Sequence, residues 1–165
     1  MVWGANVAES RLMREIERIL DQLNRAWGGD SWTGVAIQPM LDDITEEQAR
    51  AHPLRGAHSI IELVAHIGAW MDAASDRLAG AERELGPEED WRDVAALSWP
   101  AAIKSIESAQ SRLCDAIART TTDDLDKITP GRDYTLYVLI HGVIQHNLYH
   151  AGQIALLKKQ VSAQL

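Results

Sequence analysis

Two histidines in the C-terminal part of the chain have the spacing of residues that can bind one metal ion together. His146 and His150 are four positions apart, so on a helix both rings project from the same face, one turn from each other. They interrupt an apolar row that recurs at alternating steps of four and three, which is typical of a helix face packed against other helices. The apolar members of this row are Leu139, Val143, Ile154, Leu157 and Val161. Buried imidazoles need partners, and neutral imidazole is the commonest metal ligand in proteins.

A third histidine, His66, flanks the apolar stripe of another predicted helix. If the two helices face each other, the three imidazoles can supply three nitrogens to one side of a metal ion and leave positions for water or substrate. The alternative is that each histidine is simply hydrogen-bonded in the core, and pairs four apart also arise by chance. The Glu-x-x-His pairs of di-iron bundles are absent from the sequence, and Asn147 stands where the helix of zinc proteases has glutamate.

Five further residues are candidates for supporting roles around such a site. Glu62, one turn before the helix-borne His66, could act as a base or as a partner for an imidazole, or it could belong to the capping box of its own helix. Gln153 falls on the metal-facing side of its helix and could orient a ligand or bind nearby backbone. Three aromatic side chains could form the walls of a pocket or fill the core, namely Trp32, Trp70 and Tyr149.

Long amphipathic helices must position these side chains. Helical periodicity and capping signals predict four of them, over residues 8–27, over 60–85, from Ser98 into the threonines at 120–122, and from Tyr134 to about 160. No strand pattern competes. We therefore predict an all-α four-helix bundle that forms a single domain over residues 1–165.

The first two helices are joined by a long connection, residues 30–58. Residues 35–41 have the pattern of a short amphipathic turn, and Thr45 begins a capping-box pattern that predicts another short helix. A connection of this length in a small helical domain more often covers a site than serves as a plain linker. We expect this connection to cover the histidine site.

Composition excludes several classes of protein. The chain has 165 residues with a formal net charge of -8 and no basic stripe, which argues against sequence-independent binding to nucleic acid or to anionic membranes. No segment has the length and apolar character of a membrane span or signal-peptide core. The single cysteine, Cys114, precludes an internal disulfide, so the simplest expectation is a cytoplasmic protein.

Three stretches of the sequence resemble the DinB-like (DinB/YfiT) superfamily of four-helix-bundle proteins. They are the Ser-Trp-Thr-Gly loop at 31–34, the segment 56–67, which contains His66, and the segment 141–154 with its H-x-x-x-H-x-G-Q-I pattern. In order and spacing the resemblance covers nearly the whole chain. The last pattern, together with the upstream histidine, is its most specific part.

The resemblance implies an up-down-down-up bundle with a divalent metal ion, which in such proteins is nickel, zinc or iron. It implies that the ligands are one histidine of the second helix and two of the last, which here are His66, His146 and His150. Members include transferases and isomerases that use the low-molecular-weight thiols mycothiol or bacillithiol, and dimers are common. The chain departs from the family at Thr33, because related sequences often have histidine after the loop tryptophan.

Three functions fit these observations. The first is a metal-dependent transferase that adds a low-molecular-weight thiol to a small electrophilic substrate. The second is a metal-dependent hydrolase that uses metal-bound water. The third is a non-catalytic, dimeric, metal-binding stress protein. A homodimer is expected in each case, without nucleic acid or membrane as a partner. The sequence alone does not separate the first two, because both need the same ligands.

Overall fold

The computed structural model describes residues 15–162, which form helices and no β-strand. The long helices are α2 (Glu15–Trp27), α5 (Ile60–Leu78), α7 (Trp99–Arg119) and α8 (Leu136–Ser162). The short ones are α3 (Ile37–Leu41), α4 (Glu46–Arg50), α6 (Pro87–Asp90) and the 3₁₀ helix η1 (Thr122–Asp124). Residues 8–14 of the first predicted helix lie outside the described part of the chain. The predicted all-α bundle is confirmed.

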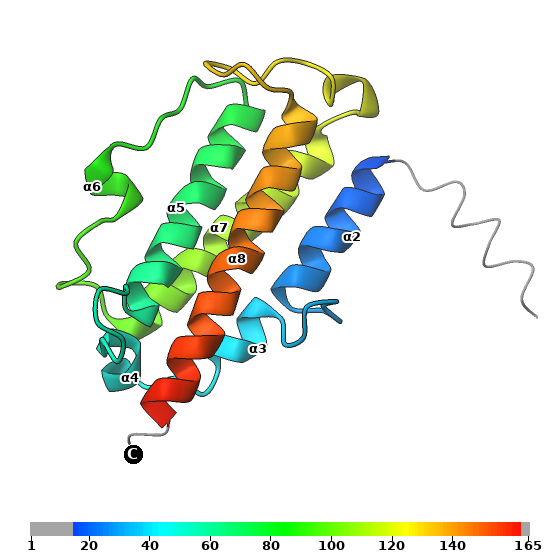
Figure 1. Ribbon diagram of the computed structural model, residues 1–165. Helices are drawn as coiled ribbons and strands as arrows, with labels where there is room; N and C mark the ends of the chain where they lie inside the picture. Colours follow the sequence, from blue (N-terminus) through cyan, green and yellow to red (C-terminus); the bar gives the residue numbers. More distant parts are fainter. Residues whose placement is uncertain (1–14, 163–165) are drawn as a thin grey trace, which may run out of the picture.

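The four long helices form an up-down-down-up bundle (Figure 1). α2 and α8 run in one direction, and α5 and α7 run in the other. α5 and α2 each pack against both α7 and α8, so α5 and α2 lie diagonally across the bundle. α5 and α7 are consecutive among the long helices and run in the same direction. The chain between them must therefore return along the whole bundle. That return segment, residues 79–98, carries α6.

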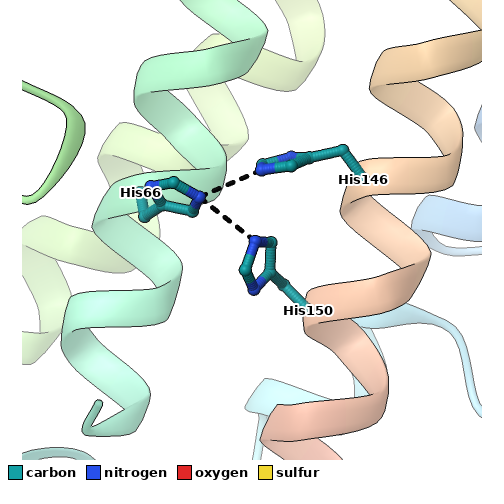
Figure 2. A group of neighbouring side chains, drawn as sticks. All are labelled: His66, His146 and His150. Atoms are coloured by element: carbon teal, nitrogen blue, oxygen red, sulfur yellow. Dashed lines mark hydrogen bonds between the residues drawn. The ribbon is translucent and has the colours of Figure 1, made fainter. Parts of the chain in front are cut away.

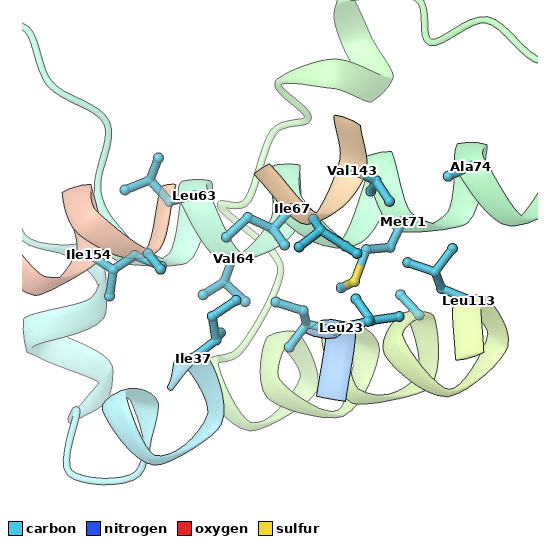
Figure 3. Packing of buried hydrophobic residues seen from close by; sticks show 14 of the residues in the cluster. Leu23, Ile37, Leu63, Val64, Ile67, Met71, Ala74, Leu113, Val143 and Ile154 are labelled. Carbon is cyan, nitrogen blue, oxygen red and sulfur yellow. The ribbon is translucent and has the colours of Figure 1, made fainter. Parts of the chain in front are cut away.

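The core consists of aliphatic side chains from all four long helices, with α3 closing one end (Figure 3). Leu23, Ile67, Met71, Leu113 and Ile154 are all buried within it. Burying such a side chain contributes about 1.5–3 kcal/mol relative to leaving it exposed. The core therefore fixes the register of α5 against α8, and this register sets the level of the histidines that the two helices carry.

Capping residues set where the second long helix begins. The hydroxyl of Ser59 accepts a hydrogen bond from the Glu62 backbone, and the Glu62 carboxylate accepts one from Ser59 N at 2.6 Å. This reciprocal pair satisfies backbone donors that the first turn of a helix cannot satisfy itself. The capping box predicted at Thr45 is also present, at the start of α4, and the turn predicted over 35–41 is α3.

The second long helix ends earlier than its periodicity indicates. The pattern predicted a helix over 60–85, but α5 ends at Leu78. Gly80 has φ +96, in the left-handed region where glycine is favoured, and Ala81 N donates to the carbonyl of Asp76 at 3.0 Å. This is the pattern of a glycine-terminated helix end. The prediction was wrong here because an apolar stripe alone does not reveal which glycine reverses the chain.

We predict opposite stability effects for alanine at two glycines. Gly80→Ala forces a side chain into a left-handed conformation and should lower the free energy of unfolding by about 1 kcal/mol. Gly142→Ala, on the exposed side of α8 with open space around the new methyl group, should raise it by about 0.5 to 1 kcal/mol. Urea denaturation measures both. Equal effects of the two substitutions would contradict the assigned helix end.

Candidate metal centre

The three predicted ligands meet between α5 and α8 (Figure 2). His66 Nε2 lies 3.0 Å from His146 Nε2 and 3.1 Å from His150 Nε2. One nitrogen of each ring lies within 4.8 Å of the others, a grouping that can hold a metal ion. His66 and His150 are buried, and His146 is partly exposed. The sequence prediction of which residues come together is thus matched by the geometry.

The outer nitrogen of His66 is held by Asp90, at the end of α6. His66 Nδ1 lies 2.9 Å from the Asp90 carbonyl oxygen and 3.1 Å from its carboxylate Oδ1. Both oxygens accept hydrogen bonds, so Nδ1 carries the proton of the neutral ring. His66 Nε2 therefore presents a free lone pair to the other two imidazoles.

His150 is held in the same manner by a residue of its own helix. Its Nδ1 donates to Gln153 Oε1 at 2.7 Å, which leaves His150 Nε2 unprotonated in the neutral ring. His146 is different: its Nδ1 is buried without a hydrogen-bond partner among the described residues. His146 can therefore donate through Nε2 to His66, but no proton remains to join His66 to His150.

Two unprotonated nitrogens that face each other at 3.1 Å repel unless a cation lies between them. A metal ion with nitrogen ligands at about 2.0–2.1 Å places those nitrogens about 2.9–3.4 Å apart, depending on the angle between them. The two measured separations, 3.0 and 3.1 Å, fall in this interval. The donor set therefore fits one divalent ion, and Asp90 and Gln153 orient two of the imidazoles in the way that outer partners commonly do at metal sites.

Burial keeps two of the three rings, His146 and His150, neutral. Burial, with further contributions from His150 and His66, lowers the pKa of His146 to about 4. Burial also lowers the pKa of His150, more than the hydrogen bond to Gln153 raises it. Near pH 7 both of these rings are neutral, so each has one nitrogen with a lone pair available to a cation.

Aromatic rings enclose the site from the α6 side. Trp91 stacks on His66 with ring centroids 3.9 Å apart, and it also stacks on His58 at 3.6 Å. Trp70 lies edge-on to His66 and donates from Nε1 to Asp90 Oδ1 at 2.7 Å. The carboxylate of Asp90 therefore contacts both His66 and Trp70.

Asp90 and Trp91 were missed by the sequence analysis, which expected the connection over 30–58 to cover the histidines. That connection contributes only His58, which stacks on Trp91. The contacts of Asp90 and Trp91 with His66 come from the return segment that carries α6, the crossover over residues 79–98. The acidic run that ends in Asp90-Trp91 was the available signal. It lacks a periodicity that would have placed it against the helix before it.

The remaining candidates lie in varied positions. The Glu62 carboxylate accepts hydrogen bonds from Ser59, which outweigh the effect of burial and lower its pKa, so it is a weaker base than an ordinary glutamate. The ring of Tyr149 lies 5.0 Å from that of His150 but is largely exposed. Trp32 is fully exposed. Catalytic or pocket roles for these three residues stay predictions.

Comparison with protein families addresses the resemblance directly. The family model of the DinB superfamily matches residues 31–154. The chain belongs to the DinB superfamily. The matched region begins at the tryptophan-containing loop and includes all three histidines, so the resemblance seen in the motifs is confirmed. Comparison with curated proteins and with solved structures gave no significant match.

We predict that Asp90→Ala weakens metal binding without unfolding the protein. Removing the carboxylate frees His66 and Trp70 to reorient, and loss of such an outer partner typically costs 10–100-fold in affinity. Competition with a chromogenic chelator measures the change. Glu88→Ala removes the same charge from the same short helix and serves as the control. Equal affinities of the two variants would contradict the role of Asp90.

We also predict a pH-dependent loss of stability in the metal-free protein. The pKa of His146 is about 4 in the fold and about 6.5 in the unfolded chain, so between these values the unfolded chain binds a proton that the folded protein excludes. Stability should fall as the pH drops from about 6.5 towards 4, and it should fall less in His146→Gln. Melting temperatures in chelator across this interval measure the difference, and parallel curves would refute it.

Proposed function

We propose that this chain binds one divalent metal ion, nickel, zinc or iron, through Nε2 of His66, His146 and His150. We propose further that it is a metal-dependent transferase that uses a low-molecular-weight thiol. The observation that carries the metal proposal is the pair of facing Nε2 atoms of His66 and His150, 3.1 Å apart, whose rings both direct Nδ1 at acceptors.

The ion, when bound, would supply a Lewis acid that favours the deprotonated form of a thiol or of water. Among the described residues, the grouping consists of three imidazoles without a carboxylate, so a bound ion would keep most of its positive charge. His146, the partly exposed member, also lines an apolar cavity of about 270 Å³. A small substrate would reach the ion from this side.

The choice of a thiol over water rests on the carboxylates around the site. A hydrolase benefits from a general base that can take a proton from water. Glu62 is engaged with Ser59, and Asp90 is engaged with His66 and Trp70. A thiol has a far lower pKa than water and needs less help to become a nucleophile. A transferase that acts on a thiol therefore suits these residues better than a hydrolase does.

The cellular location and the oligomeric state of the protein stay predictions. Among the described residues, no helix is both long enough and apolar enough to cross a membrane. We propose a cytoplasmic homodimer without nucleic-acid partners, in keeping with the net charge of -8. Light scattering of purified protein measures its mass in solution.

We predict that tag-free protein contains about one equivalent of metal per chain and consumes thiol in the presence of an electrophile. Elemental analysis measures the metal, and a thiol-reactive dye measures consumption against a panel of small electrophiles. His150→Gln should lose both metal and activity. His141→Gln should keep both, since His141 lies on the same helix and contacts Tyr137 rather than the three ligands.

Two results would contradict the transferase. Ester or amide turnover that needs metal but not thiol would favour the hydrolase. Metal binding that raises the melting temperature, with no turnover of any substrate, would favour the non-catalytic metal-binding protein. A chain that takes up no metal after reconstitution would contradict the metal proposal itself.

A further inference from the structure

A buried arginine near the end of α5 has no acidic partner within residues 15–162. Arg77 is only 1% exposed, although arginine is almost never fully buried unless paired. Its Nε donates to the carbonyl of Arg83 at 2.8 Å, but its Nη2 is buried with no hydrogen-bond partner among the described residues. None of the ion pairs between described residues includes Arg77.

The charged groups near Arg77 do not compensate it. Arg83 and Arg132 carry the same charge, and Glu84, a carboxylate that acts on Arg77, is exposed and paired with Arg132 at 2.6 Å. Burial lowers the pKa of Arg77, but a guanidinium stays protonated in proteins. A buried charge of this kind destabilises the fold unless a counter-ion binds to it.

Arg77 also lines the apolar cavity that adjoins the metal centre. The cavity has a volume of about 270 Å³, close to the lower limit for small-molecule sites. Arg77 and His146 are the charged or titratable members of its lining apart from Tyr134; the other members are Trp70, Ala74, Val138, Leu139, Gly142 and Val143. The lining thus combines an apolar body with a cationic group and a metal ligand.

Trp70 links the two polar ends of the cavity. Its ring lies 5.7 Å from Arg77 Cζ and 5.5 Å from the ring of His146. Both ends therefore lie close enough for one small molecule to reach them together. The flat Trp70 ring would lie along the body of such a molecule.

We propose that this cavity binds a small carboxylic acid, whose carboxylate is received by Arg77 and whose apolar body lies along Trp70. The planar guanidinium matches a carboxylate in shape and charge. A phosphate dianion fits less well, because the lining holds one permanent cation and is otherwise mainly apolar. With its carboxylate at Arg77, the acid would direct its opposite end towards His146. If the proposed transferase function holds, that end carries the electrophilic carbon.

Calorimetric titration of the chelator-treated full chain tests the carboxylate site without the metal. The probes are 3-phenylpropionate and its neutral amide, which share one apolar body. The acid should bind at least tenfold more tightly than the amide, and Arg77→Met should abolish that preference. Arg77 also lines a neighbouring cavity, and Arg119 lines only that neighbouring one, so Arg119→Met should keep the preference if the acid binds beside Trp70.

A second variant covers the case in which Arg77→Met fails to fold. A side chain built at Gly142 meets open space, so Gly142→Leu should fill the cavity while leaving Arg77 and the helix intact. It should lose acid binding without a fall in its melting temperature.

Three results would overturn the proposal: equal binding of acid and amide, acid binding that survives Gly142→Leu, or loss of the preference in Arg119→Met. The last would place the acid in the neighbouring cavity, which Lys127 also lines. Because the titration is done without metal, a chain that takes up no metal would leave this result unaffected.

Discussion

The site depends on where two protons lie. Asp90 and Gln153 accept from the Nδ1 atoms of His66 and His150, and this fixes both Nε2 atoms as lone-pair donors that face each other at 3.1 Å. In an apolar interior such an arrangement is unfavourable until a cation joins the two nitrogens. The packing of α5 against α8 holds the two rings at this separation, so the bundle core acts directly on the chemistry of the centre.

The topology of the bundle supplies the rest of the site. Because α5 and α7 are parallel, the chain must return along the outside of the bundle, and this return brings Asp90 and Trp91 onto His66. An antiparallel pair joined by a tight turn would leave the outer side of His66 open to water. The crossover thus gives the centre both a hydrogen-bond acceptor and an aromatic cover. The early end of α5 at Leu78 also places the unpaired Arg77 at the far end of the adjoining cavity.

The grouping of three histidines could be predicted from the sequence because helical periodicity fixes which residues share a face. His146 and His150 had to project together, and a bundle made His66 their natural neighbour. Asp90 and Trp91 could not be predicted, since a crossover of irregular backbone has no period that fixes its path. The burial of Arg77 could not be predicted for another reason. An arginine near a helix end is usually solvated, and only the tertiary structure shows that this one is buried. The burial of Asn147 could not be predicted either: it is 1% exposed, and its Oδ1 has no hydrogen-bond partner in the described part of the chain.

The proposal that three imidazole nitrogens hold one metal ion can be tested directly. X-ray absorption spectroscopy at the metal edge of tag-free, reconstituted protein measures the ligand atoms directly. We expect three imidazole nitrogens at about 2.0–2.1 Å, with no sulfur neighbour and any further ligand a lighter atom from solvent. A spectrum that shows a sulfur ligand from Cys114, or fewer than three imidazoles around the ion, would contradict it.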